Sequence, residues 1–211
     1  MKKISKMVFR RLPRYYRYLN DLKEMGVERI SSTELSKKMH VTASQIRQDL
    51  NCFGGFGQQG YGYNVEQLHG AIADILGLSR HYKMIIIGAG NLGHALANYA
   101  GFVRRGFRLV GVFDINPAII GTEVCNLKVL SIDELEAFCE REKPEIAVLT
   151  VSKPAAVEVA NRLPAVGIRG IWNFSFMELT PPAGVCVENV HLSDSLMRLS
   201  QNITSMSESK E

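Results

Sequence analysis

Residues 84–93 read Met-Ile-Ile-Ile-Gly-Ala-Gly-Asn-Leu-Gly, an apolar run that leads directly into a Gly-x-Gly-x-x-Gly motif. A continuous apolar run is typical of a parallel strand buried on both faces of a sheet. The first glycine permits a tight turn, the second allows close approach to a pyrophosphate, and the third lets helix and strand pack closely. Leu92, Leu96, Tyr99 and Val103 follow at helical spacing. The segment therefore predicts the strand, loop and helix that open a Rossmann domain.

A second strand is predicted over residues 108–114, and it ends in an acidic residue, Asp114. Asp114 lies about 20 residues past the motif, as expected of the acid that binds a ribose 2′-hydroxyl. A carboxylate there would repel a 2′-phosphate, which favours NAD(H) over NADP(H). Asp114 could instead only cap the turn at residues 115–117.

The alternation of strands and helices continues, with strands expected at 145–151, 168–174 and 185–190 and helices at 131–141 and 154–164. Ligands of such sheets lie at the carboxyl ends of the strands. Asn173 and Phe174 are further candidates for the nicotinamide half, although core residues would fit the same pattern. The predicted cofactor-binding residues are Gly88, Ala89, Gly90, Asn91, Leu92, Gly93, Asp114, Ile115, Thr150 and Val151.

The N-terminal part begins with an apolar stripe at helical spacing over residues 8–22, and Gly26 can end that helix. Pro13 would disrupt a helix interior, so the helix either begins near Pro13 or kinks there. Two short helices are expected next, the first with Leu35 and Met39 and the second with Ala43, Ile46 and Leu50 on one face. Ser31 or Ser32 caps the first, and Thr42 with Gln45 forms a reciprocal capping box at the second.

Two short helices joined by a tight turn are typical of a helix-turn-helix motif, whose second helix reads bases. Arg can pair with guanine, and Gln or Asn with adenine. An ordinary amphipathic helix with a polar outer face remains the other interpretation. The side chains expected to reach DNA from this helix are Ser44, Gln45, Arg47 and Gln48.

Residues 53–63 alternate aromatic residues with glycine, which predicts a hairpin of two aromatic-bearing strands around a glycine-rich tip. A hairpin directly after a recognition helix is the wing of a winged helix, and its tip could enter the minor groove. A purely structural hairpin is the alternative. Asn64 then offers a cap for a fourth helix that Gly77 ends.

Charge is distributed unevenly along the 211 residues. Residues 1–80 hold thirteen Lys and Arg against seven Asp and Glu, whereas the remainder has a net charge of −2 within the overall +4. This asymmetry suggests that the N-terminal part meets a polyanion. We therefore predict a winged-helix domain at 1–80, a Rossmann domain at 81–190 and a C-terminal helix and tail at 191–211. The final helix has a stripe of Leu192, Leu196, Leu199 and Ile203 that could pack on its own domain or on a partner subunit.

Several function classes are disfavoured. No apolar run approaches the ~20 residues of a membrane span, and no secretory signal is recognisable, so a cytoplasmic location is expected. The four cysteines form no CxxC pair, and no metal site or catalytic constellation is found. A small NAD-dependent oxidoreductase and a nucleotide-binding module, for example for coenzyme A, remain as alternatives to a DNA-binding sensor.

The chain resembles the Rex family of redox-sensing repressors over residues 4 to about 203. The resemblance is carried by Arg11-Leu-Pro-Arg-Tyr-Tyr-Arg-Tyr-Leu19, Val41-Thr-Ala-Ser-Gln-Ile-Arg-Gln-Asp-Leu50, Phe53-Gly54, Gly60-Tyr-Gly-Tyr63, Gly88-Ala-Gly-Asn-Leu-Gly93 and Asn173-Phe174. It implies a non-enzymatic homodimer with a swapped C-terminal helix. Such a repressor binds palindromic operators when NAD⁺ dominates and releases them when NADH rises.

The resemblance also implies roles for particular residues. Arg47 and its polar neighbours would enter the major groove, and Arg11 completes the predicted DNA-contacting set. The wing tip, with Gln58, Gln59 and Tyr61, would lie in the minor groove. Arg17 and Tyr99 match family residues that take part in the switch. His191 stands where members often carry the acidic partner of the helix-one arginine, and Asp194 is the candidate substitute.

Overall fold

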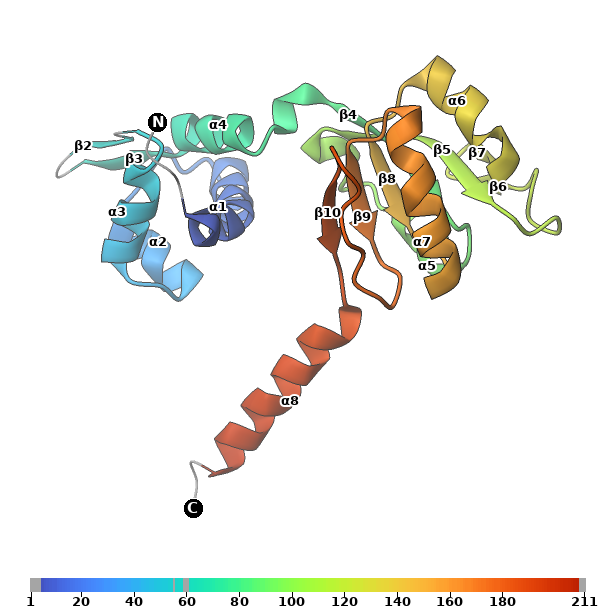
Figure 1. The fold of residues 1–211 in the computed structure, drawn as a ribbon. Helices are drawn as coiled ribbons and strands as arrows, with labels where there is room; N and C mark the ends of the chain where they lie inside the picture. The colour runs from blue at the N-terminus through green and yellow to red at the C-terminus, as the bar shows by residue number, and fades with distance from the viewer. Residues whose placement is uncertain (1–4, 55, 59–60, 209–211) are drawn as a thin grey trace. The chain divides into compact units, whose positions relative to one another are not determined.

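The computed structural model describes residues 5–54, 56–58 and 61–208 (Figure 1). The chain divides into two compact units, with the boundary between Arg80 and His81. Each unit has its own apolar core, and the two are described separately below.

The first helix of unit 1, α1 (Lys6–Glu24), begins well before Pro13. The Ser5 side chain caps it by accepting a hydrogen bond from the Met7 amide. Pro13 therefore lies inside the helix, on its exposed side, and the expectation of a start near Pro13 was wrong. The predicted apolar stripe is buried; it consists of Val8, Leu12, Tyr15, Leu19 and Leu22.

Three further helices pack with α1 in this unit, and each begins at a predicted cap. Helix α2 (Ser32–Met39) has a reciprocal capping box between Ser31 and Glu34. Helices α3 (Ala43–Asn51) and α4 (Val65–Ile75) begin at Thr42 and Asn64, whose side chains accept from amides one turn ahead. Such caps satisfy amides that have no partner inside the helix.

The hairpin after α3 is smaller than the sequence predicted. Strands β2 (Gly57–Gln58) and β3 (Gly62–Asn64) pair antiparallel, and β1 (Arg29–Ile30) joins β3 from the other side. Phe53 and Phe56 lie before β2, so the expectation of two aromatic-bearing strands was wrong; only β3 carries one, Tyr63. The arrangement is a helix-turn-helix followed by a wing.

Unit 2 is built on a seven-stranded sheet of order β10-β9-β8-β4-β5-β7-β6, parallel except at the β6 edge. Its centre is the predicted apolar strand, which extends from Tyr82. The strands are β4 (Tyr82–Ile87), β5 (Phe107–Asp114), β6 (Glu123–Val124), β7 (Leu127–Ser131), β8 (Ile146–Leu149), β9 (Gly170–Asn173) and β10 (Cys186–Asn189).

Helices cover the two faces of this sheet unequally. Helices α6 (Leu135–Glu142) and α7 (Lys153–Arg162) pack on one face, whereas α5 (Asn91–Ala97) packs on the other. The predicted continuation of α5 to Val103 was wrong. The Tyr99 amide bonds to the Leu96 carbonyl in a tighter turn, and a separate 3₁₀ turn spans Val103–Arg105. The segment between β9 and β10, which the structure describes throughout, contains no helix, so the face opposite α7 stays uncovered there.

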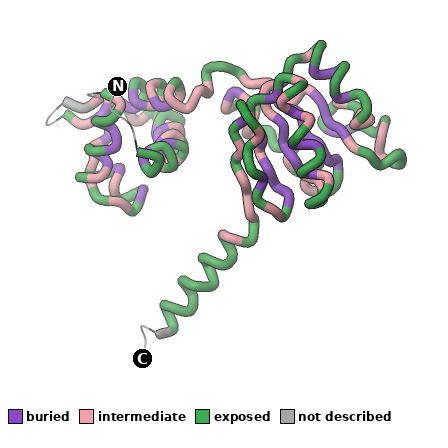
Figure 2. Tube along the Cα trace, in the orientation of Figure 1, coloured by how far each residue is buried: buried purple, intermediate pink, exposed green. Residues whose placement is uncertain are grey.

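The last helix, α8 (Leu192–Glu208), follows β10 and is exposed along almost all of its described length (Figure 2). Leu196 is 68% exposed and Leu199 53% exposed, although both belong to the predicted apolar stripe. Among the described residues, no helix is long and apolar enough to cross a membrane.

Candidate functional site

The glycine loop between β4 and α5 leaves room for a ligand at one defined point. Gly88 has φ +102°, and a Cβ there would lie 2.5 Å from the Thr150 carbonyl oxygen. A Cβ on Gly93 would collide with the Gly88 carbonyl oxygen. A Cβ on Gly90 would meet nothing within 4 Å. The outer glycines thus close the turn and pack the helix, and the middle glycine faces open space, as a pyrophosphate site requires.

The first turn of α5 adds hydrogen-bond donors at this point. Gly90 occupies the cap position and has no side chain to bond the free amides. Backbone amides at a helix start, combined with the helix dipole, favour a bound anion. Asn91 and Leu92 lie in this turn, as the sequence predicted.

Asp114 ends β5 beside the glycine loop. Its Oδ2 accepts a hydrogen bond from the Ala89 amide at 2.6 Å, and its Oδ1 accepts one from the Asn116 amide at 2.8 Å. The second bond is the turn cap that the sequence offered as an alternative to ribose binding. An ionised carboxylate has about four acceptor sites, so two remain for ribose hydroxyls. Ile115 follows and is 73% exposed.

The residues that follow β8 contact the glycine loop at Gly88. Thr150 donates its hydroxyl hydrogen to the Gly88 carbonyl oxygen at 2.7 Å, and Val151 lies against Gly88. Asn173 is fully buried; its amide donates to Met177 and Asn189 and accepts from Ser175. Phe174 is also buried, so this pair organises the loop after β9.

The predicted reading helix α3 presents three of its four candidates openly. Ser44, Arg47 and Gln48 are exposed, and Arg47 donates to the Ser32 hydroxyl on α2 at 3.0 Å. The fourth, Gln45, differs from the prediction. The Thr42 hydroxyl accepts a hydrogen bond from the Gln45 backbone amide. The Gln45 side chain, however, donates to Asp49 at 2.8 Å. The expected reciprocal capping box is therefore only half formed.

Asp49 is a residue that the sequence reasoning missed. It is 1% exposed and binds the Arg11 guanidinium through two hydrogen bonds, of 2.6 and 2.7 Å. Arg11 was predicted to contact DNA, and the structure places two of its nitrogens on this carboxylate. A usable signal was available: a polar residue four positions after Gln45, on the same helix face.

Burial and hydrogen bonding in this cluster shift the pKa values of Asp49 and Tyr15. Burial alone would raise the pKa of Asp49, but hydrogen bonds from Arg11, Gln45 and Tyr15 outweigh it and hold the pKa below its ordinary value. Burial, followed by the bond to Asp49, raises the pKa of Tyr15. The carboxylate is therefore ionised at neutral pH.

The wing residues are only partly described. Gln58 lies in β2, whereas Gln59 falls outside the described residues. Tyr61 is 69% exposed at the end of the wing, and the Arg29 guanidinium lies 5.9 Å from its ring centroid. Arg29 also donates to the Tyr61 carbonyl oxygen at 3.3 Å, so it supports the wing from β1.

Of the three predicted switch residues, one lies in unit 1 and two lie in unit 2. Arg17 is exposed on α1 of unit 1. Tyr99 is half exposed after α5 and packs edge-on to Phe102, whereas Asp194 lies in the first turn of α8. Their role in a switch stays a prediction.

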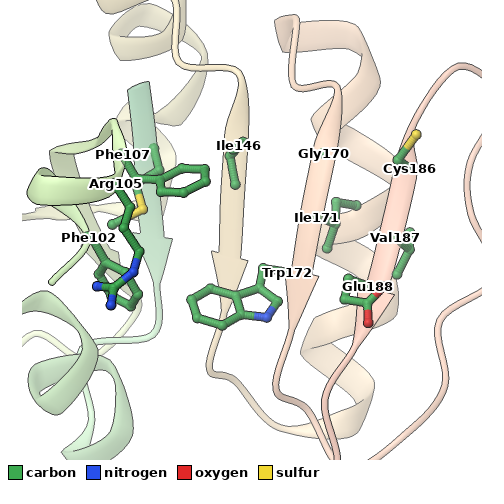
Figure 3. A pocket seen from close by; sticks show the side chains of 11 residues that line it. Phe102, Arg105, Phe107, Ile146, Gly170, Ile171, Trp172, Cys186, Val187 and Glu188 are labelled. Atoms are coloured by element: carbon green, nitrogen blue, oxygen red, sulfur yellow. The ribbon is translucent and has the colours of Figure 1, made fainter. Parts of the chain in front are cut away.

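An apolar pocket of about 420 Å³ lies on the uncovered face of the sheet (Figure 3). It is lined by the starts of several strands, including Ile146 and Gly170, together with Trp172 and Phe107. The glycine loop follows the opposite end of β4, so this pocket is not the dinucleotide site. It is an apolar hollow on the face of the sheet that no described helix covers. Among the described residues, no cluster of His, Cys, Asp and Glu could hold a metal ion.

Comparisons with known proteins give matches in both units. Residues 3–51 match the family described as "Putative DNA-binding protein N-terminus", and residues 79–177 match the CoA binding domain family. Two proteins named redox-sensing transcriptional repressor Rex are each 55% identical to this chain. The one from Thermoanaerobacter pseudethanolicus aligns over 95% of this chain and 90% of its own length, and that from Clostridioides difficile over 94% and 95%.

Solved structures are similar over the full chain. The crystal structure of RSP with β-NAD⁺ and operator DNA has a TM-score of 0.90 and 52% identity, covering 100% of this chain and 97% of that one. RSP with β-NADH has a TM-score of 0.90 and 49% identity, covering 100% and 99%.

Proposed function

This chain belongs to the Rex family of redox-sensing transcriptional repressors, and we propose that it binds palindromic operator DNA and is released when NADH binds. The observation that carries this proposal is the full-length similarity to a repressor solved both with NAD⁺ and operator DNA and with NADH. Its relatives are DNA-binding regulators rather than enzymes.

The DNA-binding part of the proposal rests on α2, α3 and the wing. Arg47 and its exposed neighbours on α3 suit base edges in the major groove. Tyr61 at the wing suits the minor groove. The excess of cations in residues 1–80 adds the phosphate attraction that dominates non-specific affinity.

The cofactor part rests on the glycine loop and Asp114. The open space at Gly90 and the free amides of α5 suit a pyrophosphate. The free acceptor sites of Asp114 suit the hydroxyls of a ribose without a 2′-phosphate. NAD(H) acts in this proposal as a sensed ligand, and the protein residues hold it without reacting.

The proposed functional unit is a homodimer, because operators with two equal half-sites match a two-fold protein. The apolar stripe of α8 and the uncovered sheet face around Trp172 both need partners. Association of two copies buries such surfaces, and a swapped α8 fits this requirement. A repressor of this kind acts on chromosomal DNA, which for this protein implies the cytoplasm.

The switch requires NADH to bind the released form more tightly than the DNA-bound form. A ligand shifts a conformational equilibrium only through such differential affinity. A ratio of about tenfold to a hundredfold per site corresponds to about 1.4–2.7 kcal/mol. We propose that Arg17, Tyr99 and Asp194 exchange partners between the two forms.

Fluorescence anisotropy of a labelled inverted-repeat duplex tests the proposal. The protein is titrated at fixed salt with NAD⁺, NADH or coenzyme A present, because phosphate contacts make affinity depend steeply on salt. Release by NADH alone supports the proposal. Sequence-blind binding that no dinucleotide alters would refute it, and turnover of a substrate would favour the oxidoreductase alternative.

A further inference from the structure

The Asp49 carboxylate of α3 accepts four hydrogen bonds, three from α1 and one from Gln45 of its own helix. Oδ2 accepts from Arg11 Nε at 2.6 Å and from the Tyr15 hydroxyl at 2.9 Å. Oδ1 accepts from Arg11 Nη2 at 2.7 Å and from Gln45 Nε2 at 2.8 Å. Four donors match the about four acceptor sites of a carboxylate. The buried charge is therefore fully satisfied and its position is fixed from α1.

This arrangement determines which way the Gln45 amide points. A carboxylate only accepts hydrogen bonds, so the NH₂ group of Gln45, and not its oxygen, must face Asp49. The usual uncertainty between the two ends of a Gln amide does not arise here. Among the described residues, the one buried side-chain polar atom without a partner is His69 Nε2, so Gln45 Oε1 is either bonded or accessible. No described residue bonds to it, and it is therefore an accessible acceptor.

The position of Gln45 gives this acceptor a use. Gln45 is the third residue of α3, in the first turn, where recognition helices contact base edges. In the major groove the hydrogen-bond donors are the exocyclic amino groups, N6 of adenine and N4 of cytosine. An amide whose oxygen is accessible and has no partner within the described part of the protein is suited to one of these groups.

We propose that Asp49 is a positioning residue that holds the Gln45 amide with its oxygen toward DNA, so that Gln45 reads an adenine or cytosine amino group in each half-site. The proposal rests on the proposed function of α3 as the reading helix. Arg11 and Tyr15 then act at one remove from the DNA: they hold Asp49, and Asp49 holds Gln45.

The first experiment needs only the wild-type protein and Gln45→Ala. A duplex is selected by the wild-type protein from a library of inverted repeats. Each adenine is then replaced by purine and each cytosine by pyrimidin-2-one, which lack the amino group. At one position per half-site the wild-type protein should lose about tenfold in affinity, within the range of a specific base contact. Gln45→Ala should bind both duplexes equally at that position.

The second experiment tests Asp49 itself. Asp49→Asn should lose most of the discrimination between the intact and amino-deleted duplexes, because the amide is free to rotate. Binding of NADH should be unchanged, since the glycine loop lies in unit 2. The exposed Asp21→Asn on α1 is the matched control and should keep the discrimination. A merely structural Asp49 would lower affinity for both duplexes equally.

The outcomes separate this inference from the proposed function. If the wild-type protein selects no duplex, the proposed function fails. If it selects one, but deletion of amino groups never affects the wild type more than Gln45→Ala, the reading role of Gln45 is wrong. If Asp49→Asn folds and keeps full discrimination, the positioning role is wrong. If Asp49→Asn does not fold, the base-deletion experiment still decides on the outward oxygen.

Discussion

The Asp114 carboxylate and the Ala89 amide are joined by a hydrogen bond of 2.6 Å, which links the end of β5 to the glycine loop after β4. The residue expected to recognise the ribose therefore also holds the loop expected to bind the pyrophosphate. Loss of this side chain should therefore weaken the contacts with both the ribose and the pyrophosphate of the ligand.

Asp114→Asn should weaken NADH binding by about tenfold or more, because an amide cannot accept from Ala89, Asn116 and a ribose together. The preference for NADH over NADPH should fall as well, since the charge that repels a 2′-phosphate is gone. Isothermal titration with both cofactors measures the two effects. The exposed Asp133→Asn serves as the control, and unchanged cofactor preference in Asp114→Asn would contradict the assignment.

Gly90→Ala should fold normally yet bind NADH at least about tenfold more weakly, because its methyl group would occupy the space left for the pyrophosphate. Gly70→Ala is the matched control, since its added methyl also meets nothing within 4 Å. It lies in α4, where the change should stabilise unit 1 by about 0.5–1 kcal/mol and leave NADH binding unaltered. Thermal unfolding and NADH titration of both variants test the pair. Wild-type affinity in Gly90→Ala would exclude the loop as the site.

Arg47→Ala should weaken operator binding by about 1–3 kcal/mol and spare NADH binding. Removal of the exposed cation Lys128 on β7 of unit 2 controls for the general loss of charge. Anisotropy at several salt concentrations compares them. Equal effects of the two substitutions would show that Arg47 contributes only long-range attraction.

Leu199→Asp together with Ile203→Asp should convert the dimer to monomers, because both charges would be placed on the apolar stripe of α8. Gln201→Asp adds a charge two residues from Leu199, on the opposite side of the helix. Sedimentation velocity should find that only the first protein dissociates, with a parallel loss of operator affinity. A dimeric double variant would show that another surface mediates association.

His69 should make unit 1 less stable in mild acid. Burial, followed by the charge of Lys23, lowers the pKa of this imidazole, which stacks on Tyr16 and has an unpaired buried Nε2. Because the unfolded state then binds the proton more readily, the free energy of unfolding falls as the pH drops below about 6.5. The loss ends once the pH is below the folded-state pKa.

His69→Phe should remove this part of the pH dependence, whereas the exposed His94→Gln should not. Urea unfolding followed by far-ultraviolet circular dichroism gives the measurement. The single tryptophan, Trp172, lies in β9, so its fluorescence reports separately on unit 2. The same acid dependence in His69→Phe would assign the effect to another group.

Local sequence signals predicted most of the fold. The caps at Ser31, Thr42 and Asn64 and the glycine loop are contacts within a few residues, so their spacing carries the information. The errors arise where distant segments decide. Gln45 has the spacing of a capping box, but Asp49, whose carboxylate is fixed by Arg11 thirty-eight positions earlier, takes its side chain instead. Helix α5 is a different case, because a local turn in which the Tyr99 amide bonds to the Leu96 carbonyl ends the helix although the apolar spacing continues to Val103.

The bare apolar stripe of α8 makes the amount of protein a regulatory variable in its own right. If two copies must meet before either covers this surface, then below the dimer dissociation constant the number of assembled repressors rises with the square of the number of chains. Halving synthesis would then leave about a quarter of the operator-competent molecules. A cell could therefore relieve repression by dilution during growth, without any change in its ratio of NADH to NAD⁺.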